Sequence, residues 1–298
     1  MKSTLFRLLI ICSLILILLW FYRKTQKSTE GFQQKERFLL KTDENIYDNF
    51  YSEIYDTLMM PQNRAKYEID LLLKTLQPTT RFSRMLEVGS GTGTFLNELH
   101  KRGYKAQGID RSKAMKRIAE IHYPDINVLC EDVMDPMAYD RAAFTHIFCM
   151  DFTLYEMEDK TTFFKNCYYW LQNNGYLVLH LADKDHFNPI IPAAKPPVID
   201  SIEQLGPTRI TKTEIDFIDF VYVSDFVTKG KQVLHKESFT DKPTQNIRQN
   251  ERTLYMDSKQ EILDMARITG FIPKGGFSMG GGPARDAAQE VLILERSS

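Results

Sequence analysis

The sequence predicts an α/β fold of the doubly wound class, built on a mostly parallel β-sheet with helices on both faces. Two observations lead to this class. From Arg84 to Asp183, short apolar runs alternate with amphipathic stretches of helical length, which is the pattern of β-α-β units. A turn with glycines at alternate positions, Gly89, Gly91 and Gly93, follows the first of these runs. Ligands of such sheets bind beyond the carboxyl ends of the strands, so this turn is the expected binding region.

The first element along the chain is an apolar run from Leu8 to Tyr22, which contains no charged residue and has basic residues on both sides. It approaches the length of about 20 residues that crosses a bilayer, and its final Trp-Phe-Tyr is typical of a membrane interface. We therefore expect residues 1–24 to form a single-pass membrane anchor. A cleaved signal peptide is the alternative, which the lack of small residues at a cleavage site disfavours.

A stretch rich in Lys, Gln, Glu, Thr and Ser follows, and we expect residues 25–43 to be a polar linker. Two amphipathic helices are then expected over Asn45–Met59 and Arg64–Leu76, because apolar side chains recur there at helical spacing. The tyrosines of the first helix suit either core packing or a lid over a ligand.

Five strands, with helices between them, are expected from Arg84 onward. The helices have recognisable ends: Ser112 is a candidate N-cap, and Gly103 and Gly175 are candidate C-terminal stops. After a helix over Ser258–Phe271, two further apolar runs joined by a glycine-rich loop bring the expected number of strands to seven. These strands are expected at RMLEVG, KAQGID, INVLCED, FTHIFCMD, YLVLHLAD, FIPKGGFSM and EVLILERS.

The segment between the fifth strand and the last helix, residues 184–256, has a different pattern. It opens with several prolines and continues with stretches in which apolar and polar residues alternate, as they do in half-buried antiparallel strands. We expect it to be a β-rich insertion in the α/β domain.

Acidic residues stand at the ends of the first three strands. Glu87 comes just before the glycine turn, Asp110 ends the second strand, and Asp132 ends the third. A phosphate-binding loop would need a Gly-Lys-Ser/Thr sequence that this turn lacks, and a dinucleotide would bring its diphosphate close to Glu87. The acids therefore favour a ligand with cationic groups and no phosphates. S-adenosylmethionine fits this description, and the Asp110 carboxylate can accept hydrogen bonds from its ribose hydroxyls.

These motifs resemble a known family. EVGSGTG, GID, CEDV and FCMDFTLYEM are similar to the motifs of class I S-adenosylmethionine-dependent methyltransferases, and the resemblance extends from about Tyr47 to the C-terminus. It implies that residues 44–298 are a methyltransferase domain with S-adenosyl-L-methionine as its cofactor, and that the C-terminal strand of the sheet is antiparallel. It also implies that the insertion 184–256 forms a cap over the acceptor site and determines the substrate.

The resemblance also implies roles for individual residues. The glycine turn and the strand ends would hold the cofactor, and the methyl group would react beside the end of the fourth strand. A general base is needed only where the acceptor is protonated when it binds. The expected cofactor-binding residues are Glu87, Gly89, Ser90, Gly91, Gly93, Asp110, Asp132, Val133 and Met150. The candidate catalytic residues are Asp151, Tyr155 and His180, and Glu156 and His186 are further candidates for a general base. Further candidates for contact with the acceptor are Asp183, His186, Tyr222 and Arg252.

Composition limits the partners and the compartment. A formal net charge of -1 over 298 residues argues against nucleic acid held mainly by its phosphates. Four scattered cysteines, no Asn-x-Ser/Thr sequon and no zinc-type spacing indicate a catalytic domain in the cytosol without a metal site. The acceptor is left open among small molecules, lipids and proteins. Two alternative functions are an NAD(P)-dependent oxidoreductase and a membrane-tethered binding protein without activity.

Overall fold

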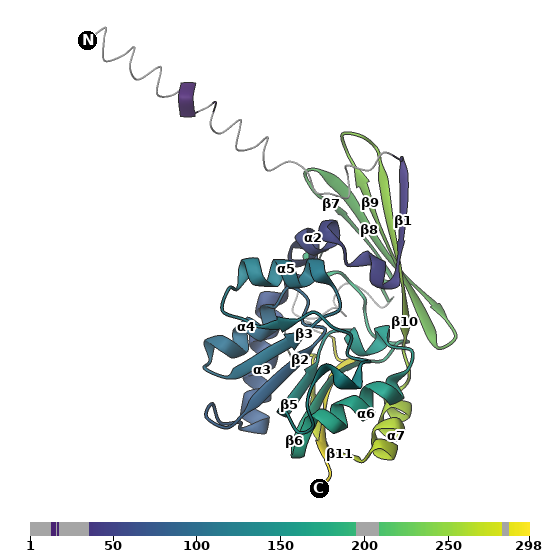
Figure 1. The fold of residues 1–298 in the computed structure, drawn as a ribbon. Helices are drawn as coiled ribbons and strands as arrows, with labels where there is room; N and C mark the ends of the chain where they lie inside the picture. The colour runs from purple at the N-terminus through teal and green to yellow at the C-terminus, as the bar shows by residue number, and fades with distance from the viewer. Residues whose placement is uncertain (1–12, 16, 18–35, 195–208, 282–285) are drawn as a thin grey trace, which may run out of the picture.

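A seven-stranded mixed sheet forms the centre of the computed structural model, which describes residues 13–15, 17, 36–194, 209–281 and 286–298 (Figure 1). Its strand order is β11-β12-β6-β5-β2-β3-β4. Strands β2 to β6 pair in parallel with one another, whereas β12 is antiparallel to both β6 and β11. The predicted fold class is confirmed. The strands are β2 Arg84–Val88, β3 Lys105–Ile109, β4 Val128–Leu129, β5 Phe144–Cys149, β6 Leu171–Ala182, β11 Phe271–Ser278 and β12 Gln289–Arg296.

Helices cover both faces of this sheet because successive strand residues point to opposite sides. In β5, Phe148 packs in the layer under α3 and α4, while its neighbour Ile147 packs in the layer under α6 and α7. The side chain of Ser112 caps α5 by accepting a hydrogen bond from the Met115 N–H at 3.0 Å, as predicted. The helices are α2 Asn49–Met59, α3 Pro61–Leu76, α4 Thr94–Lys101, α5 Lys113–His122, α6 Lys160–Trp170 and α7 Lys259–Thr269.

A second sheet of five strands, called here the cap sheet, lies beside α2, with β10 running down to the central domain (Figure 1). Its order is β1-β10-β9-β8-β7, and all pairs except β1-β10 are antiparallel. The predicted β-rich insertion is therefore present. The strands are β1 Phe38–Thr42, β7 Lys212–Asp216, β8 Phe220–Lys229, β9 Gln232–Asp241 and β10 Ile247–Tyr255.

The cap sheet rests on α2 through an apolar layer and one buried arginine. Tyr51 of α2 packs against Phe239 and Tyr222 of the cap sheet. Arg248 of β10 is 1% exposed and donates hydrogen bonds to both carboxylate oxygens of Asp48, the N-cap residue of α2, at 3.0 and 2.8 Å. These contacts fix the cap sheet relative to α2, which also packs against α5 of the central domain.

The predicted polar linker over residues 25–43 needs correction at its end. Residues Phe38–Thr42 form strand β1, which pairs with β10. The segment lacks the alternation of buried apolar and exposed polar residues that marks a strand in a sequence, because Phe38, Leu40 and Thr42 are all exposed. Its backbone nevertheless pairs with β10 and completes the edge of the cap sheet. The remainder of the linker, residues 25–35, lies outside the described residues.

The predicted membrane anchor, residues 1–24, lies outside the described residues apart from Ser13–Ile15 and Ile17. Within the ranges that the structure describes, none of the helices combines the length and the apolar character needed to cross a bilayer.

Candidate functional site

The glycine turn between β2 and α4 is tightly bent and close to the neighbouring strand end. Gly89, Gly91 and Gly93 all have positive φ angles, of 66°, 52° and 80°. The Gly89 N–H donates to the Ile109 carbonyl at 2.8 Å, which holds the turn against the end of β3. Side chains other than hydrogen are strained at such angles, so the conformation explains why glycines occur at alternate positions.

A cavity of about 250 Å³ opens at the carboxyl ends of the strands, next to this turn. A smaller cavity of about 50 Å³ adjoins it on the other side of the turn, and both are lined by Gly89, Gly91 and Asp151. The larger one contains the predicted residues Asp110, Asp132 and Val133. The smaller one contains the predicted residues Glu87, Ser90 and Met150.

Of the predicted cofactor-binding residues, only Gly93 lines neither cavity. A Cβ atom at Gly93 would lie 2.4 Å from the Ile126 Cδ1 atom and 3.1 Å from the Ala119 Cβ atom. The residue therefore lets α4 approach α5 closely. The roles of the other eight residues in cofactor binding remain predictions.

Glu87 has the electrostatic character expected beside a cationic ligand. Its side chain is buried, and its Oε2 atom has no hydrogen-bond partner among the described residues. Burial, together with the nearby Asp151 and Asp110, raises the pKa of Glu87 well above its usual range. An ammonium group in the smaller cavity would supply the missing partner, so this acid fits the amino group of a bound S-adenosylmethionine.

Asp110 is held in place by two backbone N–H groups. Its Oδ2 atom accepts from Gly91 and its Oδ1 atom from Ser112, each at 2.8 Å. Burial raises the pKa of Asp110 above its usual value. Each carboxylate oxygen can accept a second hydrogen bond, so the fixed group is suited to the paired hydroxyls of a ribose.

Among the three catalytic candidates, only Asp151 reaches the cavities. It follows β5 with a φ angle of 52°, and its Oδ1 atom lies 2.5 Å from the Arg64 Nη1 atom of α3. This geometry aims the carboxylate at the junction of the two cavities and pairs it with a cation from the helix layer.

The other two catalytic candidates, Tyr155 and His180, line neither of these two cavities. The Tyr155 hydroxyl donates to the Ala182 carbonyl at 3.2 Å and accepts from the Ala182 N–H at 2.8 Å, so it joins the short 3-10 helix Thr153–Glu156 to the end of β6. His180 is fully buried on the α3 side of the sheet, 3.2 Å from the Arg64 Nη2 atom. Burial and this neighbouring arginine lower the pKa of His180 to about 4.

The remaining candidates, for contact with the acceptor or for a general base, also divide between the cavity and other positions. Arg252 and Glu156 line the larger cavity. Asp183 and His186 pair with each other at 2.8 Å outside both cavities, and the buried Tyr222 faces the interior of the cap sheet and α2.

Several cavity residues were not among the predicted site residues. Tyr47, Tyr55 and Met59, from α2 and the turn before it, line the larger cavity. The only sign of them in the sequence was the helical spacing of aromatic residues, which is compatible both with core packing and with a lid over a ligand. Arg111 and Met115 at the start of α5 had no sequence signal, since nothing in the chain near them indicates which side of the helix meets the ligand.

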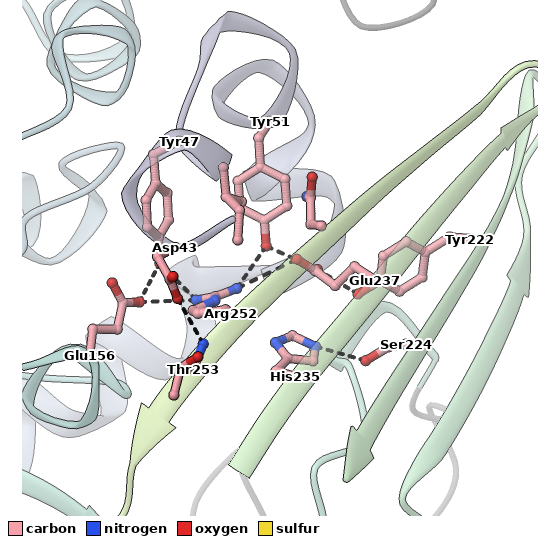
Figure 2. Close-up of polar contacts among 12 residues, drawn as sticks. Asp43, Tyr47, Tyr51, Glu156, Tyr222, Ser224, His235, Glu237, Arg252 and Thr253 are labelled. Carbon is pink, nitrogen blue, oxygen red and sulfur yellow. Dashed lines mark hydrogen bonds and ion pairs between the residues drawn. The ribbon is translucent and has the colours of Figure 1, made fainter. Parts of the chain in front are cut away.

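A polar network connects the cap sheet to the cavity, with Arg252 of β10 at its centre (Figure 2). The Arg252 Nη1 atom donates to the Tyr47 hydroxyl at 2.7 Å and to Glu156 Oε1 at 3.0 Å. Its Nη2 atom donates to the Tyr51 hydroxyl at 3.2 Å and lies 3.5 Å from Glu237 Oε2. One guanidinium from the cap sheet thus contacts two carboxylates, one in the cap sheet and one in the cavity wall.

The larger cavity is strongly acidic. Six carboxylates and two guanidinium groups line it, which leaves a formal charge of -4. Such a lining favours cationic ligands and opposes phosphates. In the part of the chain that the structure describes, no group of three or more His, Cys, Asp or Glu side chains could hold a metal ion. The carboxylates are Asp110, Glu131, Asp132, Asp151, Glu156 and Glu158, and the guanidinium groups are Arg111 and Arg252.

Comparisons with known proteins agree with this geometry. Residues 86–179, which run from β2 to β6 and contain the glycine turn, match the family model Methyltransf_11, described as a methyltransferase domain. No curated protein matches the chain in sequence.

Solved methyltransferase structures share the fold over most of their length. An S-adenosylmethionine-dependent methyltransferase from Clostridium acetobutylicum ATCC 824 is 13% identical with a TM-score of 0.62, covering 84% of this chain and 99% of its own. CalS10, an amino pentose methyltransferase from Micromonospora echinaspora, is 17% identical with a TM-score of 0.58, covering 85% and 99%. The sugar N-methyltransferase KedS8 from Streptoalloteichus sp ATCC 53650 is 17% identical with a TM-score of 0.54, covering 79% and 87%.

The match over residues 86–179 and the shared fold confirm the predicted enzyme class and cofactor.

Proposed function

We propose that this methyltransferase transfers a methyl group from S-adenosylmethionine to a nitrogen atom of a small molecule. The observation that carries the proposal is the acidic cavity of about 250 Å³, which adjoins the glycine turn and is walled by α2 and by Arg252 of the cap sheet. An acidic, partly enclosed site favours a compact acceptor with an amine over a neutral lipid or an extended protein segment.

The names of two structural neighbours support the same acceptor class. CalS10 acts as an amino pentose methyltransferase and KedS8 as a sugar N-methyltransferase, and both share the fold of this chain. Their sequence identity is low, so the support for this chain rests mainly on the charge and size of its own cavity.

Methyl transfer depends more on aligning the donor with the acceptor than on activating the methyl group. A bound S-adenosylmethionine supplies a methyl group that its sulfonium already activates. Glu87 would hold the amino group of the cofactor, and Asp110 would hold its ribose. Tyr47 and Tyr55 close one wall of the site and limit access of water. Holding donor and acceptor in line can supply several kcal/mol of the barrier reduction, about 7–11 in favourable cases.

Two measurements on the purified full-length chain test this function. Calorimetry should detect binding of S-adenosylmethionine and of S-adenosylhomocysteine but not of NAD. The enzyme is then incubated with a methyl-labelled donor and a cell extract, which is separated into low-mass, lipid and protein fractions. Label in the low-mass amine fraction supports the proposal, and label confined to lipid or protein would overturn the acceptor class.

A matched pair of variants controls both measurements. Asp110→Ala removes a carboxylate from the cavity, whereas Asp125→Ala removes an exposed carboxylate that lines neither cavity. Binding and methyl transfer should be lost in the first variant and retained in the second.

We also propose that residues 1–24 anchor the enzyme in a membrane with its catalytic domain in the cytosol. The support is the uncharged run from Leu8 to Tyr22 and its basic flanks. Wild-type protein should resist alkaline carbonate extraction, and a charge at the centre of the run, Ile15→Arg, should release it. A wild-type chain that is extracted completely, or whose mature mass lacks the run, would exclude the anchor.

A further inference from the structure

Glu156 is the carboxylate of the cavity wall that is both held in place and incompletely neutralised. It ends the short 3-10 helix η4, Thr153–Glu156, and its side chain is 17% exposed. The Oε1 atom accepts hydrogen bonds from the Tyr47 hydroxyl and from Arg252. The Oε2 atom accepts none from the described residues, and Arg111 Nη2 lies 3.6 Å from it. One oxygen is therefore fixed while the other is available to a ligand.

Arg252 cannot fully neutralise Glu156 because it also serves Glu237. The Glu237 side chain is 1% exposed, and its Oε1 atom accepts hydrogen bonds from the Tyr51 and Tyr222 hydroxyls at 3.0 and 2.8 Å (Figure 2). Burial opposes ionisation of Glu237, but His235, Arg252 and the two tyrosines together lower its pKa below the usual value. Glu156 thus shares the buried guanidinium of Arg252 with Glu237, and its other nearby cation, Arg111 at 3.6 Å, is 40% exposed.

The other carboxylates of the cavity are less suited to bind a cationic acceptor. Asp110 has both oxygens bonded to backbone N–H groups, and the Asp151 side chain, which pairs with Arg64 at 2.5 Å, is 41% exposed against 17% for Glu156. Glu131, Asp132 and Glu158 are exposed, so water screens their charge. Glu156 alone among the six combines a shielded position with an oxygen that lacks a hydrogen bond within the described structure.

We propose that Glu156 is a catalytic residue that binds the amine of the acceptor and takes its proton, and that Arg252 and Glu237 are the positioning residues behind it. This assignment rests on the proposed function, since it names the group that recognises the nitrogen acceptor.

The proposed step is balanced in protons and electrons. The acceptor enters as an ammonium, one N–H bond breaks, and an O–H bond forms at Glu156 Oε2. The freed nitrogen lone pair forms the new N–C bond as the methyl carbon separates from sulfur, and the C–S electron pair stays on sulfur. The products are a methylated ammonium and S-adenosylhomocysteine, and Glu156 returns its proton to the solvent after they leave.

The test uses n-butylammonium as the probe and n-butanol as its uncharged counterpart, added to full-length protein with ¹³C-labelled glutamate. The carboxyl carbon signal that disappears in Glu156→Gln belongs to Glu156. This signal should move with n-butylammonium and not with n-butanol. The probe should bind Glu156→Gln at least about 10-fold more weakly, as expected for loss of one charge-assisted hydrogen bond. Glu251→Gln, on the same strand as Arg252 but outside the cavity, should bind as wild type does.

Equal affinity in wild type and Glu156→Gln, or a preference for n-butanol, would overturn the assignment. The probe is measured both without and with S-adenosylhomocysteine. A chain that fails to bind S-adenosylhomocysteine contradicts the proposed function, whereas a chain that binds it and gives no Glu156 signal change contradicts only the role of Glu156.

The positioning role of Glu237 has its own readout. Glu237→Gln frees Arg252 to pair with Glu156 alone, so the Glu156 carbon signal should move before any probe is added, and the affinity for n-butylammonium should fall. Glu237→Asp should restore both in part. A lower melting temperature with an unmoved Glu156 signal would show that Glu237 serves stability only.

Discussion

Gly89 is the position of the glycine turn where a methyl group should cost most. A Cβ atom there would lie 2.5 Å from the Thr153 Cγ2 atom and 2.7 Å from its Oγ1 atom, and the φ angle is +66°. The left-handed backbone costs a residue with a Cβ about 1–2 kcal/mol, and overpacking adds about 1–3 kcal/mol. Gly89→Ala should therefore lower the free energy of unfolding by about 2–5 kcal/mol, which is a large share of the stability of a typical domain.

Gly91→Ala is the matched control because it separates the two contributions. Gly91 has a φ angle of +52°, but a Cβ atom there would meet nothing within 4 Å. Its cost should be limited to the backbone term of about 1–2 kcal/mol. Removing the clashing side chain in the double variant Gly89→Ala/Thr153→Ala should recover about 1–3 kcal/mol relative to the sum of the single variants.

Urea denaturation of the three single variants, Gly89→Ala, Gly91→Ala and Thr153→Ala, and of the double variant, followed by circular dichroism, measures these differences. Two results would refute the reasoning: a Gly89→Ala variant no less stable than Gly91→Ala, or a double variant whose stability is the plain sum of the single changes. Either would mean that Thr153 moves away from Gly89 at little cost.

Three further predictions concern the cofactor site, the cap sheet and pH. Asp110→Ala should weaken S-adenosylhomocysteine binding by about 30-fold or more through loss of two hydrogen bonds to a charged group. It should also lower the melting temperature, because the Gly91 and Ser112 N–H groups lose their acceptor. Unchanged affinity in calorimetry would remove the ribose role. Arg248→Met should cost about 3 kcal/mol in urea denaturation, since it removes a buried guanidinium that pairs with the partly exposed Asp48. A cost below about 1 kcal/mol would contradict the clamp between the cap sheet and α2. Burial lowers the pKa of His146 and His235 to about 4, so between pH 6.5 and 4 the unfolded chain binds more protons and stability must fall as pH falls. Each histidine accounts for about 3 kcal/mol of the stability lost over this window. His146→Phe should therefore reduce the loss of unfolding free energy between about pH 6.5 and 4 by about 3 kcal/mol. A pH profile of stability that does not change would show that the fold does not lower the pKa of His146.

The glycine turn and the acid at the end of β3 were predictable because their signals are local. Gly89, Gly91 and Asp110 each follow a strand that the apolar pattern reveals, and strand ends of a parallel sheet meet at one edge. The same reasoning did not place His180, which lies inside β6, where alternation turns its side chain toward Arg64 of α3 and away from the larger cavity. Proximity in sequence to a strand end therefore indicates a site only for residues beyond the strand itself.

The chain sequence by itself determined the fold class, the glycine turn and the acidic strand ends, because these depend on periodicity, backbone conformation and short spacings. The tertiary structure alone decided how Tyr47, Glu156, Arg252 and Glu237 meet. These four residues come from a turn before α2, the end of η4 and two strands of the cap sheet, and Arg252 reaches Glu156 across 96 positions of sequence. Contacts of this kind arise when separate layers pack on one another, and no local pattern along the chain records which side chains the packing brings together.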